Sequence, residues 1–246
     1  MNVSNIKLNK NGKYEVIIDN KKYILYQDVI IKYLLFSKKE IDEKLLNSII
    51  NDNNYYDAYF KMIKFINIKL RTKNEVRKKL IELNVSNNDQ ERIINTLVNQ
   101  GYLNDEVYIK AFINDKINLS LDGPNKIKNE LLKNNFSEEK VLKYLENFKD
   151  IWDSRIEKII NKKVKINKTY SKKMLTNKIT NELIKLGYSK NDFSDYLKNI
   201  NFDDKLIYEK EYQKAYNKLI KKYDDETAKI LAKQKLYTKG FYVENK

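Results

Sequence analysis

The residues with the clearest chemical potential in this chain of 246 amino acids are basic. Between positions 155 and 173, eight cationic side chains accompany one carboxylate, Glu157. Such an excess attracts polyanions, which can be nucleic acid or an acidic protein groove. Lysine enrichment in an AT-rich genome is the alternative, but glutamate would be equally cheap to encode and is nearly absent here. The cations are Arg155, Lys158, Lys162, Lys163, Lys165, Lys168, Lys172 and Lys173.

A second, smaller basic segment lies between positions 71 and 79. It holds two of the four arginines in the chain, and arginine suits bidentate contacts with phosphate or carboxylate groups. The start of an ordinary surface helix explains the same residues equally well, so both interpretations stay open. The members are Arg71, Lys73, Arg77, Lys78 and Lys79.

The composition argues against most catalytic chemistry. The chain has no cysteine and no histidine, which excludes thiolate metal sites and nucleophiles activated by histidine. The phosphate-binding loops GxxxxGK[ST] and GxGxxG are absent as well. Acidic residues are scattered and lie mostly near expected helix starts. The sequence therefore predicts a binding protein that is not an enzyme and needs no cofactor or metal.

A seven-residue pattern recurs four times and indicates how the basic residues are positioned. The copies begin at Leu80, Leu131, Leu183 and Leu236, at offsets of 51, 52 and 53 residues. A nearly constant offset is typical of one supersecondary unit repeated in tandem. The low content of one proline and five glycines favours helices. We therefore predict a mainly α-helical, elongated array of three-helix repeats that resemble helix-turn-helix units.

The recurring pattern has the features of a helix end followed by a helix start. Leucines precede a residue that tolerates left-handed backbone, an apolar residue follows, and serine then supplies an N-cap in three copies. The left-handed positions are Asn84, Asn135, Gly187 and Gly240, and the N-caps are Ser86, Ser137 and Ser189. Thr72 and Glu75 predict a capping box before the first copy.

These signals divide the chain into five segments. Residues 1–53 form a strand-rich extension, in which alternating apolar residues around Asn11-Gly12 and Asp19-Asn20 predict a β-meander, with short helices at 27–35 and 38–50. A long helix is expected at 54–70. Three-helix repeats occupy 54–103, 104–149 and 150–202, and a partial repeat occupies 203–246. No secretory signal or membrane span is evident, which favours the cytoplasm.

The order and spacing of several motifs resemble the RecX family, in the longer form found in low-GC Gram-positive bacteria. Gly101-Tyr102-Leu103-Asn104-Asp105 is followed by Gly123-Pro124 and Glu130-Leu131, as in that family, and Arg71-Thr72 followed by Glu75 resembles its preceding repeat. Asn104 departs from the family's first Asp, and lysine replaces many arginines. The resemblance implies a structural role, as a family signature, for Gly101, Tyr102, Leu103, Asp105, Gly123, Pro124, Leu131, Gly187 and Gly240.

The resemblance implies a regulator of the RecA recombinase, and we expect the protein to be a monomer. Such a protein would bind RecA and its filament on single-stranded DNA, limit filament growth, and so reduce strand exchange, ATP turnover and coprotease activity in recombination, DNA repair and the SOS response. The residues of the two basic segments, except Lys79, would then contact RecA or DNA through their charges. The alternatives are a helix-turn-helix-like DNA-binding protein that acts without RecA and a helical scaffold for another acidic partner.

Overall fold

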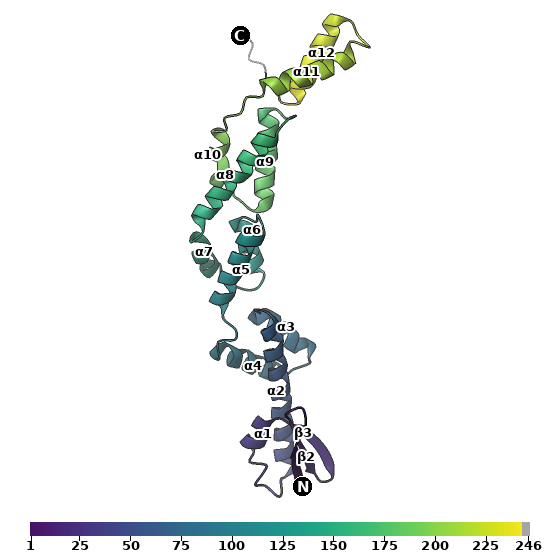
Figure 1. The fold of residues 1–246 in the computed structure, drawn as a ribbon. Coiled ribbons are helices and arrows are strands. Elements are labelled where there is room, and N and C mark those ends of the chain that lie inside the picture. The colour runs from purple at the N-terminus through teal and green to yellow at the C-terminus, as the bar shows by residue number, and fades with distance from the viewer. Residues whose placement is uncertain (243–246) are drawn as a thin grey trace. The chain divides into compact units, whose positions relative to one another are not determined.

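The computed structural model describes residues 1–242, over which three strands and twelve helices follow one another (Figure 1). It divides into two compact units, Met1–Tyr108 and Ile109–Lys246, which are described separately. The predicted mainly helical fold with a small N-terminal sheet is confirmed. The boundaries of the predicted repeats stay predictions.

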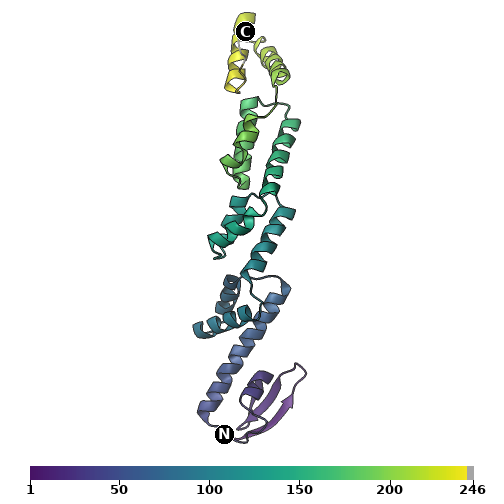
Figure 2. The ribbon, with the colours of Figure 1, turned by 90° about the vertical axis from the view of Figure 1, so that its left-hand side faces the viewer.

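The first unit begins with an antiparallel meander of three strands in the order β1-β2-β3. The strands are β1 (Val3–Leu8), β2 (Tyr14–Ile18) and β3 (Lys21–Leu25). Asp19 and Asn20 both have positive φ, as the tight hairpin turn between β2 and β3 requires. One face of the sheet buries Val16 and Ile18 against the short helix α1 (Gln27–Lys32) and the first half of α2 (Glu43–Ile68). Figure 2 shows the sheet, in purple, beside α2.

Helix α2 corrects one prediction. The separate helices expected at 38–50 and 54–70 form one continuous helix, Glu43–Ile68. The polar run at 51–54 does not end the helix, because its side chains bind the neighbouring elements. Asn53 accepts a hydrogen bond from the backbone N–H of Tyr26 at 2.9 Å and donates to the carbonyl of Ile24 at 3.0 Å. The hydroxyl of Tyr33 donates to Asp52 at 2.7 Å.

The second half of α2 forms a three-helix unit with α3 (Lys73–Glu82) and α4 (Asn87–Asn99). Its core includes Met62, Leu80 and Leu97, each at most 1% exposed. The predicted capping box is present: the Glu75 N–H donates to Oγ1 of Thr72 at 3.0 Å, and the Thr72 N–H donates to Oε2 of Glu75 at 2.9 Å. Helix α5 (Asp105–Leu119) follows and contains the boundary between the two units.

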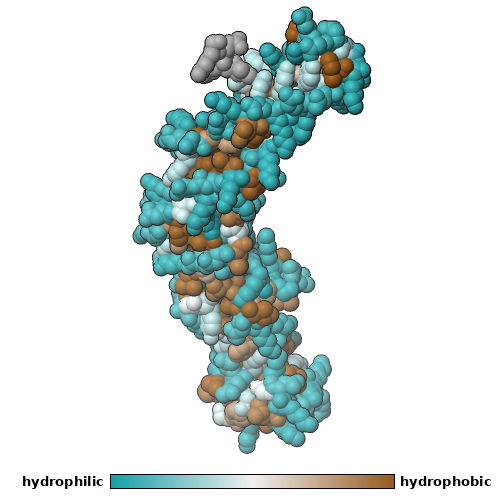
Figure 3. Space-filling view, turned by 45° about the horizontal axis from the view of Figure 1, so that its top comes forward, coloured by the Kyte–Doolittle hydropathy of each residue, from teal (hydrophilic) through white to brown (hydrophobic). Residues whose placement is uncertain are grey.

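The second unit continues the helical pattern. Helices α6 (Pro124–Leu132) and α7 (Glu138–Glu146) pack together, α8 (Lys149–Ile166) contacts both α9 (Lys172–Leu186) and α10 (Lys190–Lys198), and α11 (Lys205–Leu219) pairs with α12 (Asp225–Thr238). Figure 3 shows hydrophilic side chains over much of one face, between separate hydrophobic patches.

The recurring pattern has the predicted cap geometry. Asn84, Asn135, Gly187 and Gly240 have φ values of 54°, 64°, 95° and 77°. After three of them the next backbone N–H donates to the carbonyl five residues earlier, at 3.0 to 3.1 Å, which is the six-to-one bond of a Schellman cap. The donors are Val85, Tyr188 and Phe241. Ser86 accepts a hydrogen bond from the Asp89 N–H at 3.2 Å, whereas Ser137 occupies the N-cap without such a bond.

The caps also join neighbouring repeats within the second unit. The N–H groups of Gly123 and Asn125, at the start of α6, donate to the carbonyls of Leu186 and Gly187 at 2.7 and 3.1 Å. A Cβ atom on Gly187 would lie 2.5 Å from Cβ of Lys126, so this position excludes other side chains. At the next junction the hydroxyl of Ser171 donates to the carbonyl of Lys239 at 2.9 Å. The start of α6 is therefore bound to the end of α9, and the start of α9 is bound to the end of α12.

Candidate polyanion-binding surface

Arg71 packs against neighbouring side chains of the first unit. Its guanidinium lies 3.8 Å from the centroid of the Phe65 ring and donates to Oε1 of Glu75 at 3.1 Å, and its side chain is only 14% exposed. Burial raises the pKa of Glu75, but hydrogen bonds from the Thr72 backbone and from Arg71 lower it further, so the net pKa lies below the usual value. Arg71 thus connects the end of α2 with the start of α3.

Most other cations of the segment 71–79 are also paired. Lys73 contacts Asp105 at 3.2 Å, and Arg77 contacts Glu91 at 2.6 Å. Lys79 contacts Glu82 at 2.7 Å. Within residues 1–242, Lys78 is the one member that is exposed and has no ion pair. The structure therefore supports the structural interpretation of this segment more than the binding one.

The basic segment 155–173 is different. Helix α8 buries Ile156, Ile159 and Ile160, and its exposed face carries Lys158, Lys162 and Lys165. These three follow the i, i+4, i+7 spacing, which places them in one row along the helix. Lys168 in the next loop and Lys172 in the first turn of α9 are exposed too.

None of these five lysines has an ion pair with any residue in the described part of the chain. The carboxylates on α8 and α9 do not neutralise them. Glu182 of α9, for example, contacts Lys163 at 2.6 Å instead. We call these unpaired residues the α8 lysines. They are Lys158, Lys162, Lys165, Lys168 and Lys172.

Three further cations of the segment have partners within the second unit. Arg155 is half-buried, donates to the backbone carbonyl of Ile117 and lies 5.5 Å from the ring of Trp152. It therefore connects α8 with the end of α5. Lys163 binds Glu182, as described, and Lys173 donates to the hydroxyl of Tyr242 at 2.5 Å.

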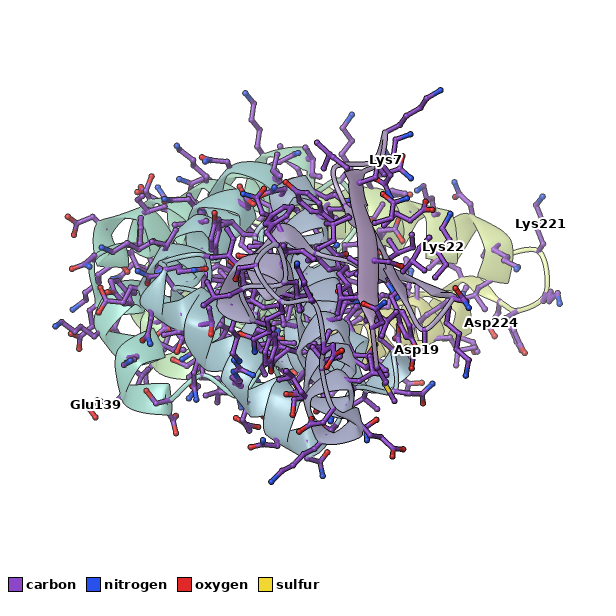
Figure 4. All side chains as sticks on the ribbon, turned by 90° about the horizontal axis from the view of Figure 1, so that it is seen from below. Lys7, Asp19, Lys22, Glu139, Lys221 and Asp224 are labelled. Carbon is purple, nitrogen blue, oxygen red and sulfur yellow. The ribbon has the colours of Figure 1, made fainter. Side chains whose placement is uncertain are left out.

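Exposed lysines also occur outside both segments. Lys7 on β1 and Lys221 after α11 point away from the ribbon (Figure 4). Lys22 on β3 also projects but contacts Glu15 at 2.5 Å. Exposure alone therefore does not distinguish the α8 lysines. Their distinction is that several unpaired charges lie in one row and continue into the adjoining loop.

Two residues beside this row were not found from the sequence. Tyr170 and Lys178 line the same groove as Lys163 and Lys168, and the ammonium of Lys178 lies 4.4 Å from the centroid of the Tyr170 ring. Lys178 falls outside the basic run, and tyrosines in this chain fit helix cores in most places. Only the packing of α8 against α9 brings the two residues to the groove.

The residues of the family signature have structural positions. Gly101, with φ 78°, ends α4, and Leu103 and Leu131 are buried, whereas Tyr102 is 44% exposed. Asp105 forms an ion pair with Lys73. Over the described residues, no cluster of acidic side chains could hold a metal ion, and no helix is long and apolar enough to cross a membrane.

Comparison with known proteins identifies relatives over most of the chain. A regulatory protein RecX of Bacillus cytotoxicus is 28% identical and covers 98% of this chain and 94% of its own length. One from Lactococcus lactis subsp. cremoris is also 28% identical, over 91% and 87%. The chain is a homologue of the RecX regulatory proteins. No family model matches it.

Solved RecX structures have the same fold. One crystal structure of a regulatory protein RecX aligns with a TM-score of 0.72 at 23% identity, over 81% of this chain and 99% of the other. RecX from Lactobacillus salivarius aligns with a TM-score of 0.57 over 61% and 99%. The fold is therefore shared with these RecX structures, while the roles of individual basic residues here stay predictions.

Proposed function

We propose that this chain regulates the RecA recombinase, without turnover of its own, by binding RecA and its filament on single-stranded DNA in the cytoplasm. The observation that carries the proposal is homology to proteins named regulatory protein RecX along 98% of the chain. Filament binding restrains filament growth, and so reduces strand exchange, ATP hydrolysis and coprotease activity.

The α8 lysines support this proposal. A row of unpaired cations can meet either an acidic protein surface or the phosphate backbone, and both are present in a nucleoprotein filament. The segment 71–79 contributes less, because its charges are already neutralised by Glu75, Asp105 and Glu91. We therefore assign filament contact mainly to the second unit.

The test is the ATP hydrolysis of the cognate RecA on single-stranded DNA, measured with increasing amounts of this protein. We expect inhibition below one molecule per RecA, because a protein that restrains growth of a filament affects many subunits. Unchanged hydrolysis at equimolar protein would contradict the proposal. A variant with Lys158, Lys162 and Lys165 replaced by alanine is expected to inhibit less.

The second candidate is a DNA-binding protein that acts without RecA, which the unpaired α8 lysines also favour. It predicts tight binding to DNA alone, decreasing steeply with salt. Binding to DNA alone combined with unchanged RecA activity would support this candidate over the first.

A further inference from the structure

A groove of about 530 Å³ lies in the second unit, where the end of α8, the loop 167–171 and α9 meet. Three lysines line it, Lys163, Lys168 and Lys178, together with one carboxylate, Glu182. Its walls also include Tyr170 and apolar residues of both helices, Ile166, Leu175 and Ile179. The groove thus combines positive charge with an aromatic and aliphatic surface.

The loop that carries Tyr170 is held in place by Asn167. Its side-chain oxygen accepts hydrogen bonds from the N–H groups of Thr169 and Tyr170 at 3.3 and 3.0 Å, and its amide donates to the carbonyl of Tyr170 at 2.8 Å. Tyr170 is nevertheless 39% exposed. The backbone that carries the ring is therefore held in place beside the lysines while part of the side chain stays accessible, and this preorganisation lowers the entropic cost of binding a ligand.

Helix α8 also borders a second groove, of about 440 Å³, which provides an internal comparison. Its tyrosine, Tyr196, is 38% exposed, nearly the same as Tyr170. Its ionisable side chains are the acidic Glu157 and Asp195, and no lysine or arginine is among the residues that line it. One helix thus separates a basic groove from an acidic one.

We propose that the basic groove binds one nucleotide of single-stranded nucleic acid, with the base against Tyr170 and the backbone phosphates near Lys168 and Lys178. Stacking on an aromatic ring accepts any base, and lysines beside the ring bind the backbone. The volume lies within the range of about 300–1,000 Å³ typical of small-ligand sites. The row formed by Lys158, Lys162 and Lys165 extends the positive surface along α8.

An acidic protein segment fits the same groove less well. Its carboxylates would pair with the lysines, but they would make no use of the flat face of the tyrosine. A nucleotide uses the charge and the flat surface together. This inference deepens the proposed function by assigning the DNA contact of a filament regulator to one groove, and it can fail independently of that function.

The test uses the full chain without RecA and a fluorescently labelled oligothymidylate of about 12 nucleotides, within the span expected for one binding surface of this kind. Fluorescence anisotropy gives the Kd for Tyr170→Ala, for Tyr170→Phe and for the matched control Tyr196→Ala. Tyr170→Ala should weaken binding at least about fivefold, whereas Tyr170→Phe and Tyr196→Ala stay within about twofold. Binding to a duplex of the same length should not depend on Tyr170, because its bases are already stacked.

Three outcomes overturn the inference: an unchanged Kd for Tyr170→Ala, equal losses on single strands and duplex, or an equal loss of affinity for polyglutamate, which would identify an acidic-protein site. Circular dichroism checks that each variant is folded. If Tyr170→Ala unfolds, Lys168→Ala with Lys178→Ala decides: the double variant should reduce the salt slope of binding to single strands by about 1.4, and an unchanged slope rejects the groove.

The same variants in the RecA assay separate the two proposals. Loss of binding to single strands in Tyr170→Ala, in a protein that never affects RecA, would leave the groove supported and the proposed function rejected. Inhibition of RecA by a protein whose binding to single strands does not depend on Tyr170 would reject the groove and keep the function.

Discussion

The two basic segments of this chain look alike in sequence and differ in structure. In the segment 71–79, in the first unit, Arg71, Lys73 and Arg77 each contact a carboxylate. In the segment 155–173, in the second unit, the α8 lysines have no ion pair within residues 1–242. Most charges of the first segment are neutralised by contacts that hold helices together, whereas those of the α8 lysines are not neutralised by any residue that the structure describes.

The difference shows what a cluster of cations means. The charge available to a partner depends on which carboxylates the fold brings nearby, and for Lys73 and Arg77 these come from other helices. Glu91 lies 14 residues after Arg77, and Asp105 lies 32 residues after Lys73. Around Lys158, Lys162 and Lys165 no such carboxylate of the described residues comes within ion-pair distance. The variants described below test this contrast.

The largest effect is expected from reversing the unpaired charges. Replacing Lys158, Lys162, Lys165 and Lys168 by glutamate should weaken binding to single-stranded DNA at least about a hundredfold near 0.1 M salt, because it removes attraction and adds repulsion. Anisotropy titration measures the change, and circular dichroism checks helicity. The control is the same reversal at Lys218, Lys221, Lys222 and Lys233, which are exposed and unpaired within the described residues. An equal loss in the control would mean that net charge alone determines binding.

The next effect is on stability and concerns the paired segment. Arg71→Ala should lower the free energy of unfolding by about 2 kcal/mol, because it removes the contact with Phe65 and leaves the half-buried Glu75 without its cation. Lys78→Ala, at the exposed and unpaired neighbour, should change stability by less than about 0.5 kcal/mol. Urea denaturation measures both. If the two variants were equally stable, Arg71 would not have the structural role assigned to it.

Acid should weaken the paired contacts of the first unit. Burial raises the pKa of Asp57, but hydrogen bonds from Lys61, Tyr26 and Lys13 outweigh it and lower the pKa to about 2. Because the pKa of this carboxyl is lower in the folded state than in the unfolded state, its charge stabilises the fold at pH values above the unfolded pKa. This stabilisation is lost as the pH falls through the folded-state pKa. The window is therefore from about pH 5 down to pH 2.

Asp57→Asn isolates that contribution. Because the carboxylate is about one third exposed and screened, we expect a loss of about 1 kcal/mol at pH 6, shrinking towards zero near pH 2. Urea denaturation of the variant and the wild type at several pH values measures the difference. A difference that does not depend on pH would show that the carboxylate's charge makes no contribution.

Local rules predicted the parts of the fold that depend on local interactions. The caps at Asn84, Gly187 and Gly240 follow from residue type and from the apolar residue after each. The continuity of α2 did not follow, because Asn53 is kept in the helix by contacts with the backbone of β3 and of Tyr26.

The candidate site was predictable only as a basic segment. Which cations are free depends on pairs between helices, such as Lys163 with Glu182. The contacts of Arg155 with Ile117 and Trp152 could not be predicted either, because Arg155 belongs to the same basic segment as the exposed lysines. Tyr170 and Lys178 are separate in sequence, and the contact between the loop 167–171 and α9 brings them together in the groove.

The smallest effect is a gain, and it converts a paired cation into a free one. Glu182→Gln leaves Lys163 in the groove without its 2.6 Å partner, so binding to single-stranded DNA should become about two- to threefold tighter and the salt slope should rise by about 0.7. The matched change Glu91→Gln frees Arg77 in the first unit. If the α8 surface alone contacts DNA, this second variant changes neither the Kd nor the slope. A gain with Glu91→Gln equal to that with Glu182→Gln would show that any freed cation binds, and the distinction between the two segments would then lie only in their carboxylates.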